Sequence, residues 1–303
     1  MLWSSVLVLL PLFVGYGLRL PQPRLQAAIG HTIEWLVYVI LGLMGLSIGA
    51  LDQLGTQLAV MSGQTLLLVV ALGVANLLAL WLWSRRYPWR LPLKVEETTG
   101  GGLGMFKGTA ILLGVVFGGI ALGTQVQLPE GLTDQLAEYT LMVLLLLIGC
   151  QLRNSGMSLK QVLLNRQGFA IAFVVVVSSL VIGGLIAPWL EVSRYQALAL
   201  VSGFGWYSLS AILIGDGMGP VWGGAAFFND LIRELVALLL IPWVMGRAPA
   251  VAIGYSGATS MDFTLPMIQK SGGMHCVPAA IVSGFLLSLL SPVLTLFFLS
   301  LAA

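Results

Sequence analysis

Four polar residues fall together inside an otherwise apolar stretch, AAFFNDLIRELVALLLIP (225–242): Asn229, Asp230, Arg233 and Glu234. In a helix, Asp230 and Glu234 share one face because they are four residues apart, and Arg233 is near enough to pair with Asp230. One arginine neutralises one carboxylate, so one negative charge is left over. We expect that charge on Glu234, where it would bind a cation or a proton. The structural alternative is a network of these side chains that only holds helices together.

Four further acidic residues lie inside or at the edges of apolar stretches: Glu34, Asp52, Asp216 and Asp262. An ionisable group at mid-membrane costs about 2.5–3.5 kcal/mol and is a functional candidate by default. Glu34, beside His31 and Trp35 near the inner end of its segment, is interpreted as an interfacial residue. Asp52 follows the apolar run 36–51, and the weakly polar residues after it leave the helix end indefinite. It therefore lies either at the outer interface or deeper in the membrane, and both interpretations stay open. Asp262 lies in GYSGATSMDFTLP (254–266).

Glycine and proline interrupt the apolar pattern in two places, around 202–221 and around 254–266. Such breaks leave half-helix ends near the membrane midplane, where transporters bind ions and substrates, and an N-terminal end would attract a substrate carboxylate. Hydroxyl groups would satisfy the freed backbone groups, and aromatic rings would face a cationic ligand. The candidates are Thr259, Ser260, Trp206, Tyr207 and Ser208, together with Asp262. The alternative is close helix packing through small residues, as at Gly114 and Gly118.

The composition requires that these side chains be held by membrane helices. Hydrophobic residues make up 58% of the 303 residues and charged residues 9%, and the mean hydropathy is +0.98. Soluble domains are about 25% charged. A soluble enzyme, a nucleic-acid-binding protein, a coiled coil and a disordered chain are therefore excluded, and the sequence indicates an all-α polytopic membrane protein.

About ten apolar segments follow one another with short loops, and most exceed the roughly 17 residues that span a bilayer as a helix. Continuous Leu, Val and Ile runs favour helices over the alternating strands of a barrel. The expected segments are 2–18, 32–51, 60–83, 105–126, 139–152, 169–190, 197–215, 222–245, 251–268 and 276–300. If 197–215 and 251–268 are re-entrant, eight full crossings remain.

The placement of basic residues predicts the orientation. With an uncleaved first helix and the N-terminus outside, eleven Lys and Arg residues fall in inner loops and two, Arg194 and Arg247, in outer loops. This follows the positive-inside rule and puts both termini outside. The basic stretch 153–168 divides the segments five and five. We expect an N-terminal membrane repeat (1–152), a cytoplasmic linker and a C-terminal repeat (169–303) of inverted topology.

Several chemistries have no signature in the sequence. There is no G-x-x-x-x-G-K-[ST], H-E-x-x-H or G-x-S-x-G motif, and the two histidines, His31 and His275, are far apart in the chain. Cys150 and Cys276 are interpreted as buried free thiols. We therefore expect no cofactor, no metal site and no enzymatic activity, and a driving force that comes from ion or substrate gradients.

Four stretches carry a resemblance to a known family: 144–168 (LLLLIGCQLRNSGMSLKQVLLNRQG), 202–213 (SGFGWYSLSAIL), 225–242 and 257–273 (GATSMDFTLPMIQKSGG). The chain resembles the bacterial lysine exporter family LysO, also called YbjE, over its whole length. The resemblance implies an inner-membrane exporter of L-lysine and its analogue thialysine. The two membrane acids held essential in that family map onto Asp52 and Glu234. Its distant grouping with cation–proton antiporters implies inverted repeats with crossed discontinuous helices.

The physics agrees with lysine/H⁺ antiport, in which Glu234 alternates between proton and substrate and Asp52 acts as partner or gate. The alternative is a Na⁺/H⁺ or other cation antiporter of the same fold, using Asp230, Glu234 and Asp262. A membrane enzyme acting on lipid-linked substrates and a channel are further alternatives. The expected partners are L-lysine, protons and the lipid bilayer, without nucleic acid, and glycine-rich faces would permit a homodimer.

Overall fold

The computed structural model describes residues 10–11, 13–18, 20, 22–50, 54–89, 103–126, 132–154, 165–273 and 275–302. Within these ranges every regular element is a helix and no strand occurs, which confirms the all-α prediction. Asp52 and most of the expected linker 153–168 lie outside the described residues. Of the first expected segment, residues 10–11 and 13–18 are described, and all of these except residue 18 are helical.

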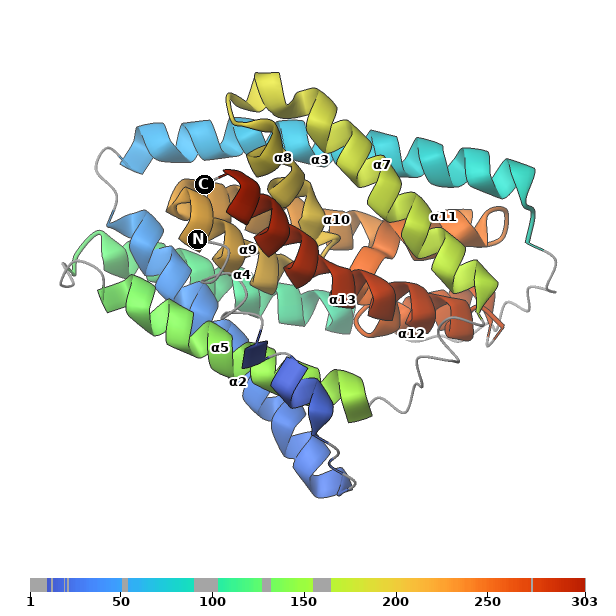
Figure 1. Cartoon of the computed structure of the whole chain (residues 1–303), viewed down its shortest axis with the longest axis horizontal. Coiled ribbons are helices and arrows are strands. Elements are labelled where there is room, and N and C mark those ends of the chain that lie inside the picture. The colour runs from blue at the N-terminus through green and yellow to red at the C-terminus, as the bar shows by residue number, and fades with distance from the viewer. Residues whose placement is uncertain are drawn as a thin grey trace. The chain divides into compact units, whose positions relative to one another are not determined.

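Seven long helices match seven of the expected apolar segments, and most are longer because they include flanking polar residues (Figure 1). They are α2 (Pro23–Gly49), α3 (Leu54–Arg86), α4 (Leu103–Gly123), α5 (Leu132–Asn154), α7 (Arg166–Leu190), α10 (Pro220–Val244) and α13 (Val277–Ala302). Within the described residues, four stretches are long and apolar enough to span a membrane: Arg24–Gly49, Leu58–Arg86, Arg166–Leu190 and Val277–Ala302. The protein is therefore a helical membrane protein.

The two expected segments 197–215 and 251–268 are each broken into short helices. The first consists of α8 (Arg194–Leu200), the 3-10 turn η1 (Val201–Gly203) and α9 (Tyr207–Met218). The second consists of α11 (Pro249–Ser256), η2 (Gly257–Met261) and α12 (Leu265–Gly272). That each broken pair crosses a membrane as one discontinuous segment stays a prediction, as does the inverted repeat.

Local sequence fixes several of these boundaries. The Asn165 side chain accepts a hydrogen bond from the Gly168 N–H and so caps the start of α7. Ser193 and Gln196 form a reciprocal capping box at the start of α8. Prolines at the first turns of α2 and α11 carry no N–H that would need a partner there.

The chain forms two compact units, and each draws on both sides of the basic stretch 153–168. The first comprises 1–62, 100–157 and 211–224, and the second comprises 63–99, 158–210 and 225–303. These units report spatial contacts and not sequence repeats, so the division into 1–152 and 169–303 also stays a prediction.

In the first unit, α2 packs on α4 and α5, and a glycine seam brings α2 and α4 together. A Cβ at Gly45 or Gly49 would collide with carbonyl oxygens of α4, and a Cβ at Gly119 or Gly123 would collide with carbonyl oxygens of α2. The predicted small-residue pair, Gly114 and Gly118, is not the contact seen, because a Cβ at either position meets no atom of the described residues within 4 Å. The four-residue spacing is right, but the contact lies on a different face of α4.

In the second unit, α13 packs along α7, α8 and η2 (Figure 1). A core of buried apolar side chains, which includes Leu80 of α3, Ile171 and Val175 of α7, Ile241 of α10 and Leu287 of α13, holds it together. This apolar core surrounds the polar residues of the candidate site.

Candidate functional site

The two interrupted stretches meet directly in the second unit, at a contact that we call the crossing (residues 203–206 and 254–258). The Ala258 N–H donates a hydrogen bond to the Phe204 carbonyl oxygen at 2.9 Å. From α13, the Ser291 hydroxyl donates to the Gly203 carbonyl oxygen at 3.3 Å. At Gly257 φ is +67°, and a Cβ there would collide with the Phe204 carbonyl oxygen. Glycine is therefore required for the two broken stretches to touch.

Asp230 of α10 lies at the start of α9 and supplies a negative charge to that helix end. Its carboxylate accepts hydrogen bonds from the Gly205 N–H at 3.2 Å, the Ser210 hydroxyl at 2.7 Å and the Asn229 amide at 3.1 Å. A helix N-terminus attracts negative charge, so this position stabilises the buried carboxylate. That a substrate carboxylate docks at a helix end of one of the broken stretches stays a prediction; at the start of α9 the Asp230 carboxylate lies close by.

Arg233, one turn further along α10, supplies a positive charge to the end of α11. Its Nε donates to the Tyr255 carbonyl oxygen at 2.8 Å, and Nη2 donates to the Gly254 carbonyl oxygen at 3.1 Å. Its guanidinium also lies 5.6 Å from the centre of the Tyr255 ring. The last carbonyl groups of a helix lack partners within it and carry partial negative charge. Arg233 therefore satisfies the C-terminal end of α11.

The predicted pairing of Asp230 with Arg233 needs a correction. The two groups attract each other electrostatically, but the hydrogen bonds described above go from each of them to a different broken stretch. Their spacing on α10 is that of a helical ion pair, and the structure uses it to hold two helix ends at the crossing.

Glu234 differs from Asp230 and Arg233 in its hydrogen bonding. The side chain is 1% exposed, and neither carboxylate oxygen has a hydrogen-bond partner among the described residues. The charged groups acting most strongly on it are two further acids, Asp262 and Asp230, and Asp262 is itself exposed. The alternative of a shared Arg–Asp–Glu network therefore does not describe Glu234, which makes no hydrogen bond to the other two.

The hydroxyl residues near the second break serve the backbone. Thr259 donates to the Ser256 carbonyl oxygen, and Ser260 is within hydrogen-bond distance of the Gly257 and Ala280 carbonyl oxygens, at 2.7 and 2.9 Å. They satisfy acceptors that the interrupted helix leaves free. Asp262 accepts a hydrogen bond from the Phe263 N–H next to it.

The aromatic candidates lie at the start of α9. Tyr207 contacts Phe227 edge to face, with ring centroids 5.8 Å apart, Trp206 is half-buried, and Ser208 is buried. That any of them binds a ligand stays a prediction. Asp52, the second acid assigned through the family resemblance, lies outside the described residues.

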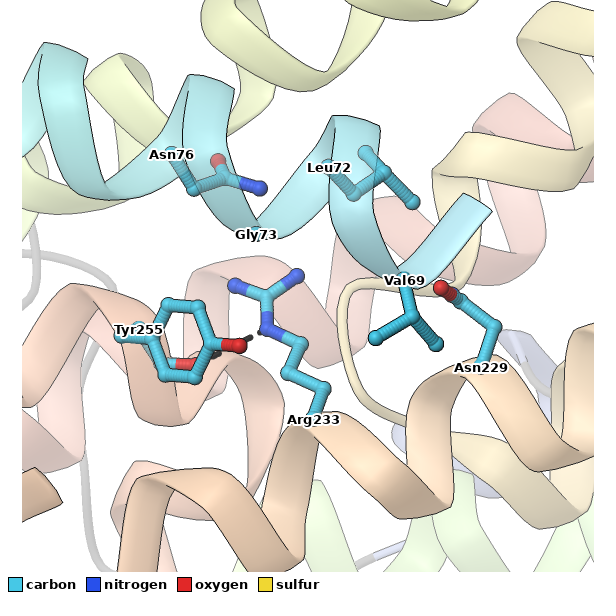
Figure 2. A pocket seen from close by; sticks show the side chains of 7 residues that line it. All are labelled: Val69, Leu72, Gly73, Asn76, Asn229, Arg233 and Tyr255. Atoms are coloured by element: carbon cyan, nitrogen blue, oxygen red, sulfur yellow. Dashed lines mark hydrogen bonds between the residues drawn. The ribbon is translucent and has the colours of Figure 1, made fainter. Parts of the chain in front are cut away.

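Sequence reasoning missed a small cavity that lies beside Arg233. Its lining residues come from three helices: Val69, Leu72, Gly73 and Asn76 of α3, Asn229 and Arg233 of α10, and Tyr255 of α11. Figure 2 shows the guanidinium of Arg233 projecting from α10 towards α3, beneath Gly73. The available signal was Asn76, a lone amide in the apolar run LLLVVALGVANLLAL (66–80).

Asn76 is fixed by α7. Its side-chain oxygen accepts hydrogen bonds from the Ser178 hydroxyl at 2.8 Å and the Ser179 hydroxyl at 3.3 Å, and its Nδ2 is 3.3 Å from the Ser179 hydroxyl. The side chain is 1% exposed. In the part of the chain that the structure describes, no group of three or more His, Cys, Asp or Glu side chains is placed to hold a metal ion.

The sequence of the chain is similar to those of known proteins. A family model described as lysine exporter LysO matches residues 113–299. The chain is 46% identical over 294 residues to the lysine exporter LysO of Escherichia coli (strain K12), which covers 97% of this chain and 98% of that protein. The chain belongs to the LysO family of lysine exporters.

A second relative supports membership in the LysO family. A putative lysine exporter of Haemophilus influenzae is 44% identical over 192 residues, which covers 63% of this chain and 96% of that protein. No solved structure matches the chain. LysO proteins are transporters, so the membership confirms the resemblance drawn from the four sequence stretches and places the broken helices and the isolated Glu234 in a transport protein.

Proposed function

We propose that the chain exports L-lysine, and its analogue thialysine, across the bacterial inner membrane in exchange for protons. Family membership supports the substrate. The observation that carries the mechanism is the carboxylate of Glu234, which is buried without a hydrogen-bond partner among the residues that the structure describes. Such a group gains from binding either a proton or an ammonium ion, and it binds one of them at a time.

The charges of the site support a one-for-one exchange. Asp230 and Arg233 cancel each other, so an ionised Glu234 leaves the three residues of α10 with one net negative charge. A lysine cation or a proton restores neutrality, and a low-dielectric site favours either neutral form over the empty charged form. Moving a unit charge against the membrane potential costs about 2.3 kcal/mol per 100 mV, and exchange for one inward proton removes that cost.

The remaining parts of the proposal rest on sequence. Asp52 is the second acid, acting as partner or gate of Glu234. Both termini lie outside, as the distribution of Lys and Arg indicates. Glycine-rich faces permit a homodimer, and the exchange does not require one.

Counterflow in proteoliposomes tests the proposal. Vesicles loaded with unlabelled lysine receive labelled lysine outside, and a dye reports internal pH. We expect labelled lysine to enter the wild-type vesicles in exchange for unlabelled lysine, and the net efflux of lysine from the loaded vesicles to bring in protons. Neither flux should occur in Asp52→Asn or Glu234→Gln. Glu191→Gln is the matched control, because Glu191 is an exposed acid at the end of α7, and it should behave as wild type.

Two results would contradict the proposal. Lysine-coupled proton flux that persists in Glu234→Gln would remove this residue from the mechanism. Proton flux on adding Na⁺, without lysine uptake, would show a cation antiporter of the same fold instead.

A further inference from the structure

The transported amino acid carries a carboxylate as well as ammonium groups, and Glu234 accounts only for an ammonium. Near the start of α9, the Asp230 carboxylate already accepts hydrogen bonds from the Gly205 N–H and the Ser210 hydroxyl and places a negative charge there, which disfavours a second carboxylate. Asp262 accepts the hydrogen bond of Phe263 next to the start of α12 and places a negative charge there. The carboxylate therefore needs positive charge and N–H donors elsewhere in the site.

We infer that the cavity between α3, α10 and α11 is the subsite for the α-carboxylate of the transported amino acid, with Arg233 as its cation and Asn76 as a second donor. The inference rests on the proposed function. It concerns the side of Arg233 that projects towards α3 (Figure 2).

Arg233 has the donors that this role needs. A guanidinium carries five N–H donors in a rigid fork that matches a carboxylate, and the hydrogen bonds to Tyr255 and Gly254 hold the fork in place. Charge-assisted hydrogen bonds of this kind are about twice as strong as neutral ones. The side chain is 6% exposed, so a carboxylate in the cavity would meet it with little water to screen the attraction.

Asn76 supplies a neutral donor on the opposite wall. Its oxygen faces the two serine hydroxyls of α7, and its Nδ2 donates one hydrogen to Ser179, so the other Nδ2 hydrogen remains for a ligand. Asn229 lines the same cavity, and its Nδ2 donates to Asp230. The cavity is thus lined by donor groups from two helices, α3 and α10.

The size of the cavity adds a condition. Its volume of about 10 Å³ is room for about one water molecule, so a carboxylate enters only when α3 and Tyr255 separate. The two already lie close, because a Cβ at Gly73 would be 3.4 Å from the Tyr255 hydroxyl oxygen. Because Gly73 has no side chain, it does not obstruct the separation of α3 and Tyr255.

The arrangement places the two ends of lysine on adjacent residues of one helix. Arg233 and Glu234 point about 100° apart around α10, so the carboxylate and an ammonium would be held by different faces of the same turn. A compound that lacks either end would lose one of the two contacts.

Competition experiments in the same proteoliposomes test the inference. The probes are cadaverine, which lacks the carboxylate, lysinamide, in which the carboxylate is neutralised, and norleucine, which lacks the side-chain ammonium. We expect each to compete with labelled lysine about tenfold or more weakly than lysine itself, because each loses one charge-assisted contact.

A charge placed in the cavity wall sharpens the test. In Asn76→Asp the new carboxylate can still accept the hydroxyls of Ser178 and Ser179, but it repels a substrate carboxylate. We expect the lysine concentration for half-maximal counterflow to rise about tenfold or more, while competition by cadaverine becomes stronger relative to lysine. Ser178→Ala is the control, because it removes one hydrogen bond of Asn76 without adding charge, and it should affect lysine and cadaverine alike.

The outcomes separate the two proposals. If wild-type protein carries lysine but cadaverine and lysinamide compete as well as lysine, or if Asn76→Asp keeps the wild-type ranking of probes, the carboxylate subsite is wrong and the exporter proposal stands. If wild-type protein carries no lysine, the proposed function fails and the subsite fails with it.

Discussion

The glycine seam between α2 and α4 and the polar crossing beside α10 are both places where backbones approach closely, and glycine serves each differently. In the seam, Gly45, Gly49, Gly119 and Gly123 remove side-chain volume from regular helices. At the crossing, Gly257 lets the chain leave the helix altogether, with φ at +67°. The seam carries no charge, whereas the crossing exposes helix ends that Asp230 and Arg233 must satisfy. Close packing of regular helices thus only holds the helices together. Close packing of broken helices also leaves helix ends that charged side chains must satisfy, and this creates a charged site.

The strongest test of this contrast is Arg233→Met. It leaves the carbonyl groups of Tyr255 and Gly254 without their donor and Asp230 without its neighbouring positive charge. Breaking a buried charge arrangement on one side costs about 3–5 kcal/mol. We expect a large loss of thermal stability in detergent, partly restored in the double variant Asp230→Asn/Arg233→Met. Equal loss in the single and double variants would show that the two charges act independently.

Gly257→Ala tests the break itself. The alanine backbone would have to adopt a positive φ, and the added methyl group would collide with the Phe204 carbonyl oxygen. Strained backbone of this kind costs about 1–3 kcal/mol before the collision is counted. We expect lower thermal stability together with loss of counterflow, because the crossing positions Asp230 and Arg233. A protein of normal stability and activity would mean that the two stretches do not need to touch.

Gly45→Ala tests the seam. The methyl group would collide with the Val116 carbonyl oxygen of α4, and overpacking typically costs about 1–3 kcal/mol. In contrast to the crossing variants, the protein that remains folded should keep its discrimination between lysine and cadaverine. Gly114→Ala is the matched control, because a Cβ there meets no atom within 4 Å. A loss as large in the control would place the seam on the wrong face of α4.

Glu234→Gln is expected to have the smallest effect on stability and the opposite sign. Removing a buried charge that has no hydrogen-bond partner should leave the thermal stability unchanged or raise it by about 1 kcal/mol, although counterflow is lost. Thermal unfolding of this variant beside Glu191→Gln checks the sign. Destabilisation by several kcal/mol would show that Glu234 holds the structure together and is not an isolated acid.

The sequence was sufficient for the helical segments and for the positions of both breaks. Long apolar runs predict membrane helices directly, and clusters of glycine, proline and hydroxyl residues marked the two places where they are interrupted. The isolation of Glu234 also followed from counting, since α10 has two acids and one arginine. These features are local in the chain, so the residue pattern is enough to find them.

What the sequence could not predict was the set of partners. Asp230 is satisfied by Gly205 and Ser210, and Arg233 by residues 254 and 255, all about 20 or more positions away along the chain. The spacing of Asp230 and Arg233 suggested a local pair because helical neighbours are visible in sequence and distant ones are not. The glycine seam was misplaced for a related reason, since Gly114–Gly118 and Gly119–Gly123 have the same spacing and only tertiary packing selects between them.

The hydrogen-bond partners of α10 come from both before and after it in the chain, and this affects how the helix is inserted into the membrane. Asp230 takes its partners from residues already made when α10 is translated, but Arg233 takes its partners from Tyr255 and Gly254, which follow it. Until about twenty more residues have been added, α10 carries a cation whose hydrogen-bond acceptors have not yet been made, and such a helix is costly to release into lipid. We therefore expect α10 to leave the insertion machinery only together with α11, so that these two helices enter the bilayer as one unit.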